Sequence, residues 1–294
     1  MGPYRPESPN RLLAIKEVLE DVKVAAYLTK IYPRAATKEE IALVHDAEYI
    51  SRIESTKGKA VFLDPDTSTS PDTYDAALLA AGGVIACVDY LFDKGSSKRA
   101  FAFVRPPGHH AEEDRAMGFC IFNNIAIAAE YAIKKYSLKK VAILDFDVHH
   151  GNGTQNHFYG RDDVFFTSTH AFPFYPGTGR NQETGSGKGK GFTLNIPIPV
   201  GSGEMEFKNA WTEIIKAVRK YGPELLLISA GFDAHEDDPI GGLSVTTGGF
   251  RWLVAELVKL AKETSEGRIV FVLEGGYSLT ALKSCVRATL EEMF

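Results

Sequence analysis

Two aspartates and two histidines stand within six residues of one another in the segment ILDFDVHHGNG, residues 143–153. Asp145, Asp147 and His149 are spaced two apart, and residues with that spacing share one face of a strand. An unpaired carboxylate is costly to bury, and a bound cation removes that cost because carboxylate oxygen and imidazole nitrogen are both metal ligands. The segment therefore predicts a metal site that uses Asp147 and His149.

A third ligand candidate, Asp233, follows the apolar run at 225–232. Two aspartates and one histidine leave a fourth coordination position for water or substrate, which is typical of a catalytic rather than a structural zinc. Fe²⁺ or Co²⁺ would also accept this ligand set. A single aspartate is more often a helix cap or an ion-pair partner, but the segments DFDVHH, GFDAH and PPGHH together favour the metal site.

The adjacent histidines His109 and His110 follow a Pro-Pro-Gly turn and are the acid–base candidates. A water that attacks a carbonyl beside a metal needs a general base, and the departing amine needs a general acid. One neutral histidine near the metal can act as the general base, and a carboxylate behind each ring would orient the ring and tune its pKa. Asp145 is the candidate partner of one of these rings.

Aromatic residues on loops flanked by glycine or proline complete the predicted site. Tyr277 follows LEGG, where two glycines allow a close approach of the backbone, and its hydroxyl could stabilise an oxyanion opposite the metal. Packing of this ring against a loop is an equally open alternative. Phe119 in MGFC and Tyr175 in PFYPGTG predict the walls of a narrow slot for an aliphatic stem, although each ring alone would also suit an ordinary core.

These polar clusters follow apolar runs that predict strands, and helical patterns alternate with the runs. The runs are continuous, which suits a parallel sheet covered on both faces. The alternation predicts one doubly wound α/β domain that binds its ligands beyond the carboxyl ends of the strands. Strands are expected at 100–104, 140–147, 164–170, 192–198, 225–232 and 268–276, and helices at 9–19, 71–92, 123–135, 205–221, 247–263 and 279–292.

The composition is that of a globular protein, with 294 residues, 44% of them hydrophobic, and a net charge of -5. Because no long basic tract is visible, duplex nucleic acid is not expected as a direct ligand. Three separated cysteines argue against a disulfide framework and against a thiolate zinc site. No apolar signal core and no uninterrupted apolar run of 18 residues is visible, so we expect a soluble, cytoplasmic protein without a membrane partner. The oligomeric state stays open.

Several segments resemble, in sequence order, the motifs of the histone deacetylase family of zinc amidohydrolases. They are RPPGHHA, GFCIFNNIAIAA, ILDFDVHHGNGTQ, STH with YPGTG, SAGFDAHEDDPIGGL and LEGGY. That family includes bacterial and archaeal relatives, acetylpolyamine amidohydrolases and acetoin-utilisation proteins, and HHGNG and LEGGY are similar to its class II branch. The resemblance implies a single catalytic domain over residues 1–294 with the arginase/deacetylase fold, three α/β/α layers around a mostly parallel sheet of about eight strands.

The resemblance also implies which residues act in catalysis. His110 is implied as the general base and acid, and His109 as its electrostatic partner, which Asp145 orients. Asn152 stands behind His110, where some branches carry aspartate. A neutral amide there implies a less basic His110 than a carboxylate would. Tyr277 is implied to polarise the scissile carbonyl.

Binding roles follow from the same resemblance. It implies Zn²⁺, with Fe²⁺ as an alternative, on Asp147, His149 and Asp233. An apolar residue at the gatekeeper position, where polyamine-selective relatives carry glutamate, argues against a strict polyamine preference. The implied acyl-lysine tunnel has Gly118, Phe119 and Tyr175 in its wall, Ile240 as gatekeeper and Asp66 in a rim loop. A structural K⁺ or Na⁺ is implied on Asp145, the main-chain oxygens of Asp147 and His149, Ser168 and Thr169.

The implied reaction is hydrolysis of N-acyl-lysine in a peptide or of a related small N-acyl amine, and three alternatives stay open. The nearest is an acetylpolyamine or other small-molecule amide deacylase. A ureohydrolase such as arginase shares the architecture but needs two manganese ions and further carboxylates, and Gly151 stands where one would be required. The third is an inactive protein that binds acyl ligands, against which the intact ligand positions and Tyr277 argue.

Overall fold

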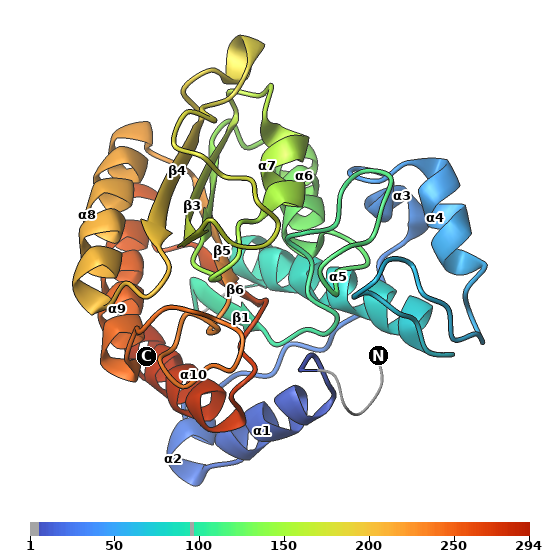
Figure 1. Cartoon of the computed structure of the whole chain (residues 1–294), viewed down its shortest axis with the longest axis horizontal. Coiled ribbons are helices and arrows are strands. Elements are labelled where there is room, and N and C mark those ends of the chain that lie inside the picture. Colours follow the sequence, from blue (N-terminus) through green and yellow to red (C-terminus); the bar gives the residue numbers. More distant parts are fainter. Residues whose placement is uncertain (1–5, 95–96) are drawn as a thin grey trace.

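A parallel sheet forms the centre of the computed structural model, which describes residues 6–94 and 97–294 (Figure 1). The first five residues of the predicted domain lie outside the described residues. Within the described residues the sheet has six strands in the order β1-β6-β5-β2-β3-β4, and each strand runs parallel to its neighbours. The strands are β1 (Arg99–Ala102), β2 (Val141–Asp145), β3 (Val164–Phe172), β4 (Thr193–Pro199), β5 (Leu225–Ala230) and β6 (Ile269–Leu273).

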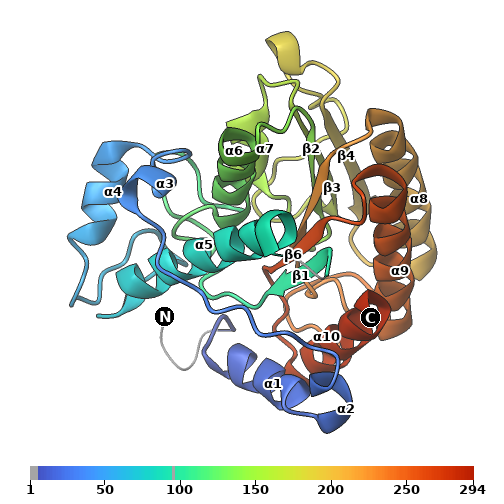
Figure 2. The same cartoon turned by 180° about the vertical axis from the view of Figure 1, so that it is seen from behind.

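Helices cover both faces of this sheet, as the continuous apolar runs predict. Figures 1 and 2 show α8 and α9 on one side of the sheet and α5 and α6 on the other. The first face is covered by α1 (Asn10–Leu19), α8 (Glu204–Tyr221), α9 (Thr247–Thr264) and α10 (Leu279–Met293), with α2 (Val22–Ala25) beside them. The second face carries α3 (Lys38–Ile41), α4 (Ala47–Glu54), α5 (Thr73–Asp89), α6 (Asn124–Tyr136) and α7 (Asn152–Phe158). A short helix η1 (Tyr90–Lys94) follows α5, and another, η2 (Gly187–Gly189), lies between β3 and β4.

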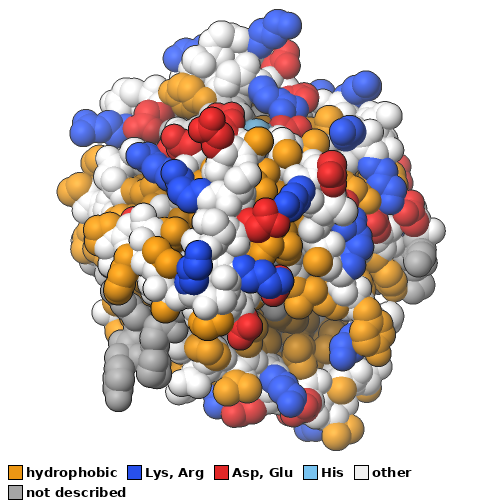
Figure 3. All heavy atoms as spheres, turned by 90° about the vertical axis from the view of Figure 1, so that its right-hand side faces the viewer, with side chains coloured by type: hydrophobic (Ala, Val, Ile, Leu, Met, Phe, Trp, Pro, Cys, Tyr) orange, Lys and Arg blue, Asp and Glu red, His pale blue; other side chains and the backbone are white. Residues whose placement is uncertain are grey.

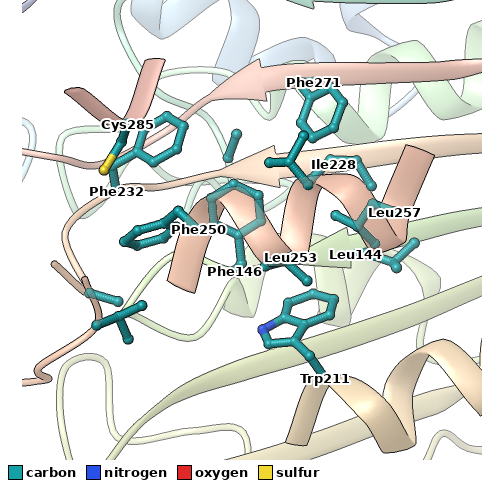
Figure 4. Packing of buried hydrophobic residues seen from close by; sticks show 14 of the residues in the cluster. Leu144, Phe146, Trp211, Ile228, Phe232, Phe250, Leu253, Leu257, Phe271 and Cys285 are labelled. Atoms are coloured by element: carbon teal, nitrogen blue, oxygen red, sulfur yellow. The ribbon is translucent and has the colours of Figure 1, made fainter. Parts of the chain in front are cut away.

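Alternate residues of each strand supply the two cores. Val141 and Ile143 of β2 join the core on the α5 and α6 side, whereas Ala142 and Leu144 join the core on the α8 and α9 side. Figure 4 shows the latter core, in which Leu144 and other strand residues pack with side chains of α8 and α9. Because side chains alternate across a strand, a sheet buried on both faces requires an unbroken apolar run. The predicted three-layer α/β/α fold is therefore confirmed.

Two features of the prediction need correction. The expected sheet of about eight strands has six in the part of the chain that the structure describes. The additional strands were implied by the resemblance alone, because no further apolar run predicts them. Each of the six predicted runs corresponds to one observed strand. The short helices α2, α3, α4 and α7 were not expected, because helices of 4 to 8 residues contain too few turns to show a clear 3.6-residue period.

The longest apolar helix is part of the core. Among the described residues, Thr73–Asp93 is long and apolar enough to cross a membrane by length and composition, with a mean hydropathy of 1.6. Half of that window is buried inside the fold, where α5 shares a core with α6. A helix that is apolar on most sides is expected at such a position.

The surface mixes side chains of opposite charge. On the face shown in Figure 3, lysines and arginines lie among aspartates and glutamates, and hydrophobic side chains line a hollow. This mixture agrees with the small net charge of -5.

Candidate active site

The strand order brings the two predicted metal loops together. β2 and β5 are neighbours in the sheet, with Asp145 opposite Ser229. From β2 the chain continues to β3 on one side, and from β5 it continues to β6 on the other side. Such a reversal of direction opens a crevice at the carboxyl ends of the two strands. Asp147 and Asp233 lie in the loops that leave these ends.

Asp147, His149 and Asp233 form a group that could hold a metal ion, called the metal group below. One ligand atom of each lies within 4.8 Å of the others. Nδ1 of His149 is 3.1 Å from an oxygen of Asp147 and 3.2 Å from an oxygen of Asp233. β2 ends at Asp145, so the expected strand spacing does not extend to Asp147 and His149. A bend after the strand, rather than strand alternation, brings these side chains together.

The charges of the metal group favour a cation. Burial and the charge of Asp147 raise the pKa of Asp233 to about 7. Burial acts to lower the pKa of His149, but hydrogen bonds to the two carboxylates raise it to about 10. The group therefore holds a positive charge between two buried carboxylates, and a divalent ion would replace the proton that otherwise supplies it. Two oxygens and one nitrogen match a zinc site with an open position.

Glycine backbone allows the loops to approach these carboxylates closely. A Cβ atom at Gly275 would lie 2.1 Å from Oδ2 of Asp233, and one at Gly231 would lie 2.0 Å from Oδ2 of Asp147. The Gly275 amide instead donates a hydrogen bond to Oδ2 of Asp147 at 2.8 Å. The glycines of LEGG thus permit the close approach that the sequence suggests.

The adjacent histidines have different partners. Nδ1 of His109 lies 2.8 Å from Oδ2 of Asp145, and Nδ1 of His110 lies 2.8 Å from Oδ1 of Asn152. Both rings are buried, and their centroids are 4.0 Å apart. The ring centroid of His110 is 6.0 Å from that of His149, so the structure places this pair beside the metal group.

The two histidines also differ in charge. Burial acts to lower the pKa of His109, but the negative charges of Asp145, Asp147 and Glu274 raise it well above its ordinary value. Burial lowers the pKa of His110 well below its ordinary value, and the positive charges of His109 and His149 lower it further. These opposite shifts favour a neutral His110 beside a charged His109.

Glu274 is a site residue that the sequence reasoning missed. Its carboxylate accepts hydrogen bonds from the backbone amides of Gly108 at 2.7 Å and His109 at 3.2 Å. It also accepts one from the hydroxyl of Ser229 at 3.2 Å. Burial raises the pKa of Glu274 to about 7. The LEGG motif contains this residue, but only its glycines and the following tyrosine were interpreted.

Tyr277 is held at the site by groups from distant segments. Its amide donates to Oδ2 of Asp238 at 2.6 Å, and the ring of Phe119 lies edge-on with its centroid 6.0 Å away. The guanidinium of Arg11 lies 5.1 Å from the centroid of the Tyr277 ring, and its Nε donates to the carbonyl of Gly276 at 2.8 Å. Arg11 is fully buried and was not expected at the site, since no spacing pattern marks it.

Two of the predicted tunnel residues lie against the His110 ring. Tyr175 lies edge-on to His110, with centroids 5.2 Å apart, and edge-on to His149 at 6.1 Å. Gly118 has a φ of +56°, and a Cβ there would lie 2.4 Å from Cδ2 of His110. Phe119 follows with a φ of +68° and is half-buried. Any larger residue at position 118 would push against the His110 ring.

The two remaining tunnel candidates lie on loops at the edge of the site. Asp66 is exposed in a loop whose Thr67 hydroxyl accepts a hydrogen bond from the Phe119 amide at 3.0 Å. Ile240 is half-buried, and its amide donates to the same Asp238 carboxylate that holds Tyr277. The loops that carry Asp66 and Ile240 are therefore hydrogen-bonded to the segments of Phe119 and Tyr277, respectively.

The residues implied for a structural cation lie at the end of β2 and in the middle of β3. Asp145 and Ser168 are opposite each other in the sheet, and both are fully buried. The Ser168 hydroxyl is 2.9 Å from Nδ1 of His170. Thr169 follows, and within the described residues its buried hydroxyl has no hydrogen-bond partner. Asp147 and His149, whose main-chain oxygens complete the implied set, lie two and four positions after Asp145.

Comparisons with known proteins agree with the motifs. The model of the histone deacetylase domain matches residues 5–293. The chain is 42% identical to histone deacetylase 10, chloroplastic, of Oryza sativa subsp. japonica, over 97% of this chain and 68% of that protein. It is 43% identical to histone deacetylase 14, chloroplastic, of Arabidopsis thaliana, over 86% of this chain and 63% of that protein. The chain thus spans about two thirds of the length of these plant relatives.

A solved structure shows the same fold. The crystal structure of the HDA15 HD domain matches this chain with a TM-score of 0.90 and 36% sequence identity. The match covers 98% of this chain and 82% of the other.

Proposed function

Since this chain belongs to the histone deacetylase domain family of deacetylases, we propose that it is a zinc-dependent amidohydrolase that removes acetyl or related acyl groups from N-acyl-lysine or a similar N-acyl amine. The observation that carries this proposal is the metal group, which lies beside a neutral buried histidine. These are the parts that hydrolysis of an unactivated amide requires.

Asp147, His149 and Asp233 would hold the metal, for which Zn²⁺ is the first candidate and Fe²⁺ the second. A zinc ion bound there would supply Lewis acidity toward the amide carbonyl and the attacking water. The carboxylates are already oriented, because backbone amides of Val148 and Gly275 donate to them. The site therefore needs little rearrangement to accept the ion.

His110 would take the proton from the attacking water and return it to the departing amine. Its neutral state suits the first step, and the bond between Nδ1 and Asn152 leaves Nε2 as the proton acceptor. The charged His109 would stabilise the negative charge that develops beside it. Burial raises the pKa of the Tyr277 hydroxyl well above its ordinary value, so this group stays protonated and can donate a hydrogen bond to the oxyanion.

A linear acyl-lysine suits the walls of this site. The ring of Tyr175 lies against His110 and His149, and that of Phe119 lies against Tyr277. Such aromatic rings can pack against an aliphatic stem. Ile240 lies on the loop whose Asp238 carboxylate also binds the Tyr277 amide, and its apolar side chain would offer no carboxylate to a second ammonium of a polyamine. We further propose that K⁺ or Na⁺ binds at Asp145 and Ser168, which face each other in two adjacent strands.

The test is to remove one ligand and measure metal and turnover together. The Asp233→Ala variant should lose both bound zinc and hydrolysis of an acetyl-lysine peptide, because two ligands hold zinc poorly. Asp237→Ala is the matched control, since that side chain is 69% exposed on the same loop and lies outside the metal group. Full activity and full zinc content in Asp233→Ala would contradict the ligand set. Loss of activity in wild-type protein on chelation, and its return with zinc, would support the metal.

A further inference from the structure

The amide of Asn152 is an ambiguous partner for a catalytic histidine. A neutral imidazole carries a single N–H, and an asparagine amide offers an acceptor at one end and a donor at the other. When Oδ1 faces His110, the proton sits on Nδ1 and Nε2 is free to accept a proton. If the amide turned over, Nδ2 would donate to Nδ1, and the histidine proton would move to Nε2. An aspartate at this position would have no such ambiguity, because a carboxylate only accepts.

Glu112 removes the ambiguity. Nδ2 of Asn152 donates a hydrogen bond to Oε1 of Glu112 at 2.6 Å. The same Nδ2 faces two further acceptors, the carbonyl of His110 and the sulfur of Met117, each at 3.4 Å. A turned amide would place its oxygen against three acceptors and lose the bond to a charged group, which is worth more than a bond between neutral groups.

The Glu112 carboxylate is itself held in place. Arg115 donates to its Oε2 at 2.8 Å, and Asn156 of α7 donates to its Oε1 at 3.2 Å. Its backbone carbonyl lies 2.9 Å from Nδ1 of His45. The side chain is 17% exposed, so these contacts are partly shielded from water. Glu112 therefore joins the loop after His110 to the first turns of α7.

We propose that Glu112 is a positioning residue that locks the Asn152 amide and thereby keeps the proton of His110 on Nδ1. Glu112 acts through Asn152 and lies behind the histidine. The importance of this lock for turnover rests on the proposed function, in which Nε2 of His110 accepts a proton.

A charge swap tests the lock. Glu112→Gln replaces an obligatory acceptor by an amide that can itself turn, and kcat should fall about tenfold to 100-fold with little change in KM. Asn152→Asp alone sets two carboxylates against each other at this contact, and kcat should fall as well. The double variant restores one acceptor and one donor in exchanged positions, so it should recover most of the lost kcat. Glu113→Gln, at an exposed neighbour in the sequence, is the matched control and should leave turnover unchanged.

Rescue separates positioning from a general structural role, because simple damage would accumulate in the double variant. A double variant no better than the worse single variant would overturn the proposal. If Glu112→Gln does not fold, the comparison of Asn152→Asp with the double variant carries the same test.

A second measurement is independent of turnover. ¹⁵N NMR of ¹⁵N-histidine-labelled full-length protein distinguishes the Nδ1–H from the Nε2–H tautomer, and the His110→Gln variant identifies the signal. We expect the Nδ1–H form in the wild type and a shift toward Nε2–H in Glu112→Gln but not in Glu113→Gln. An unchanged tautomer in Glu112→Gln would overturn the proposal. A shifted tautomer in a protein that hydrolyses no acyl-lysine substrate would refute the proposed function and still support the lock.

Discussion

The surroundings of His109 and of His110 differ, although the two residues are adjacent in the chain and equally buried. Each Nδ1 lies 2.8 Å from its partner, but Asp145 ends β2 and offers a carboxyl group, whereas Asn152 begins α7 and offers an uncharged amide. Glu274 adds a second carboxylate behind His109 alone. The pKa of His109 is accordingly raised and that of His110 is lowered.

Burial alone would lower the pKa of both rings, so the difference between them comes from the charges that surround each one. Neighbouring groups whose environments push their pKa values apart are a mark of acid–base assignment. The neutral His110 is suited to proton transfer, and the charged His109 is suited to electrostatic stabilisation.

The largest expected effect comes from deleting each ring in turn. His110→Ala should lower kcat by about 10² to 10⁴, the usual contribution of a general acid–base group. His109→Ala should lower kcat by about tenfold to 100-fold, as the loss of a partner does. Steady-state kinetics with an acetyl-lysine peptide, on samples of equal zinc content, measures both. Equal losses in the two variants would break the distinction between the rings.

A smaller effect is expected when the charge behind His109 is removed. In metal-free protein, Asp145→Asn should lower the pKa of His109, because the nearest negative charge is lost. The pKa of His110 should rise at the same time, since a less charged His109 no longer opposes its protonation. NMR titration of the two imidazole signals gives both pKa values. The comparison fails if neither value moves.

The smallest effect concerns Glu274. Burial raises its pKa from 4.5 to about 7. A carboxyl whose pKa is raised by folding stabilises the folded state fully below the unfolded value, and this contribution is lost as the pH rises through the folded value. The contribution of Glu274 to the free energy of unfolding of metal-free protein should therefore decrease between about pH 5 and about pH 8, and the Glu274→Gln variant should lack this decrease.

Urea unfolding at several pH values measures this slope. Glu266→Gln is the control, because the Glu266 side chain is 75% exposed and should not alter the slope. Identical slopes for wild type and Glu274→Gln would show that burial does not raise the pKa of the carboxyl behind His109.

Much of the fold could be predicted because strands that are buried on both faces of a sheet need continuous apolar runs, which are visible in the sequence. The run at 140–147 is apolar from Val141 to Leu144, and these four residues alternate between two separate cores. The long helices α6, α8 and α9 begin and end close to their predicted bounds for a similar reason, since each must present an apolar stripe to the sheet. The predicted strands extend past the observed ends at Asp145, Ala230 and Leu273. The following residues turn away from the ladder to build the site.

The site was predictable only in part. Motifs and resemblance placed the metal group and both histidines, because these residue types are rare together at strand ends. Glu274 and Glu112 were overlooked because a glutamate in a loop carries no spacing signal. Arg11 was overlooked because its contact with Gly276 joins residues 265 positions apart.

The sequence by itself determined which residues are apolar enough to form strands and which polar groups stand at their ends. Only the tertiary structure decided that β2 and β5 lie side by side, which joins Asp147 to Asp233. It also decided that Asp145 reaches His109 while Asn152 reaches His110. The physical reason is that the type of a side chain is fixed at its own position in the sequence. Its charge and its hydrogen-bond partner depend on groups from distant segments, which only packing brings within hydrogen-bonding distance.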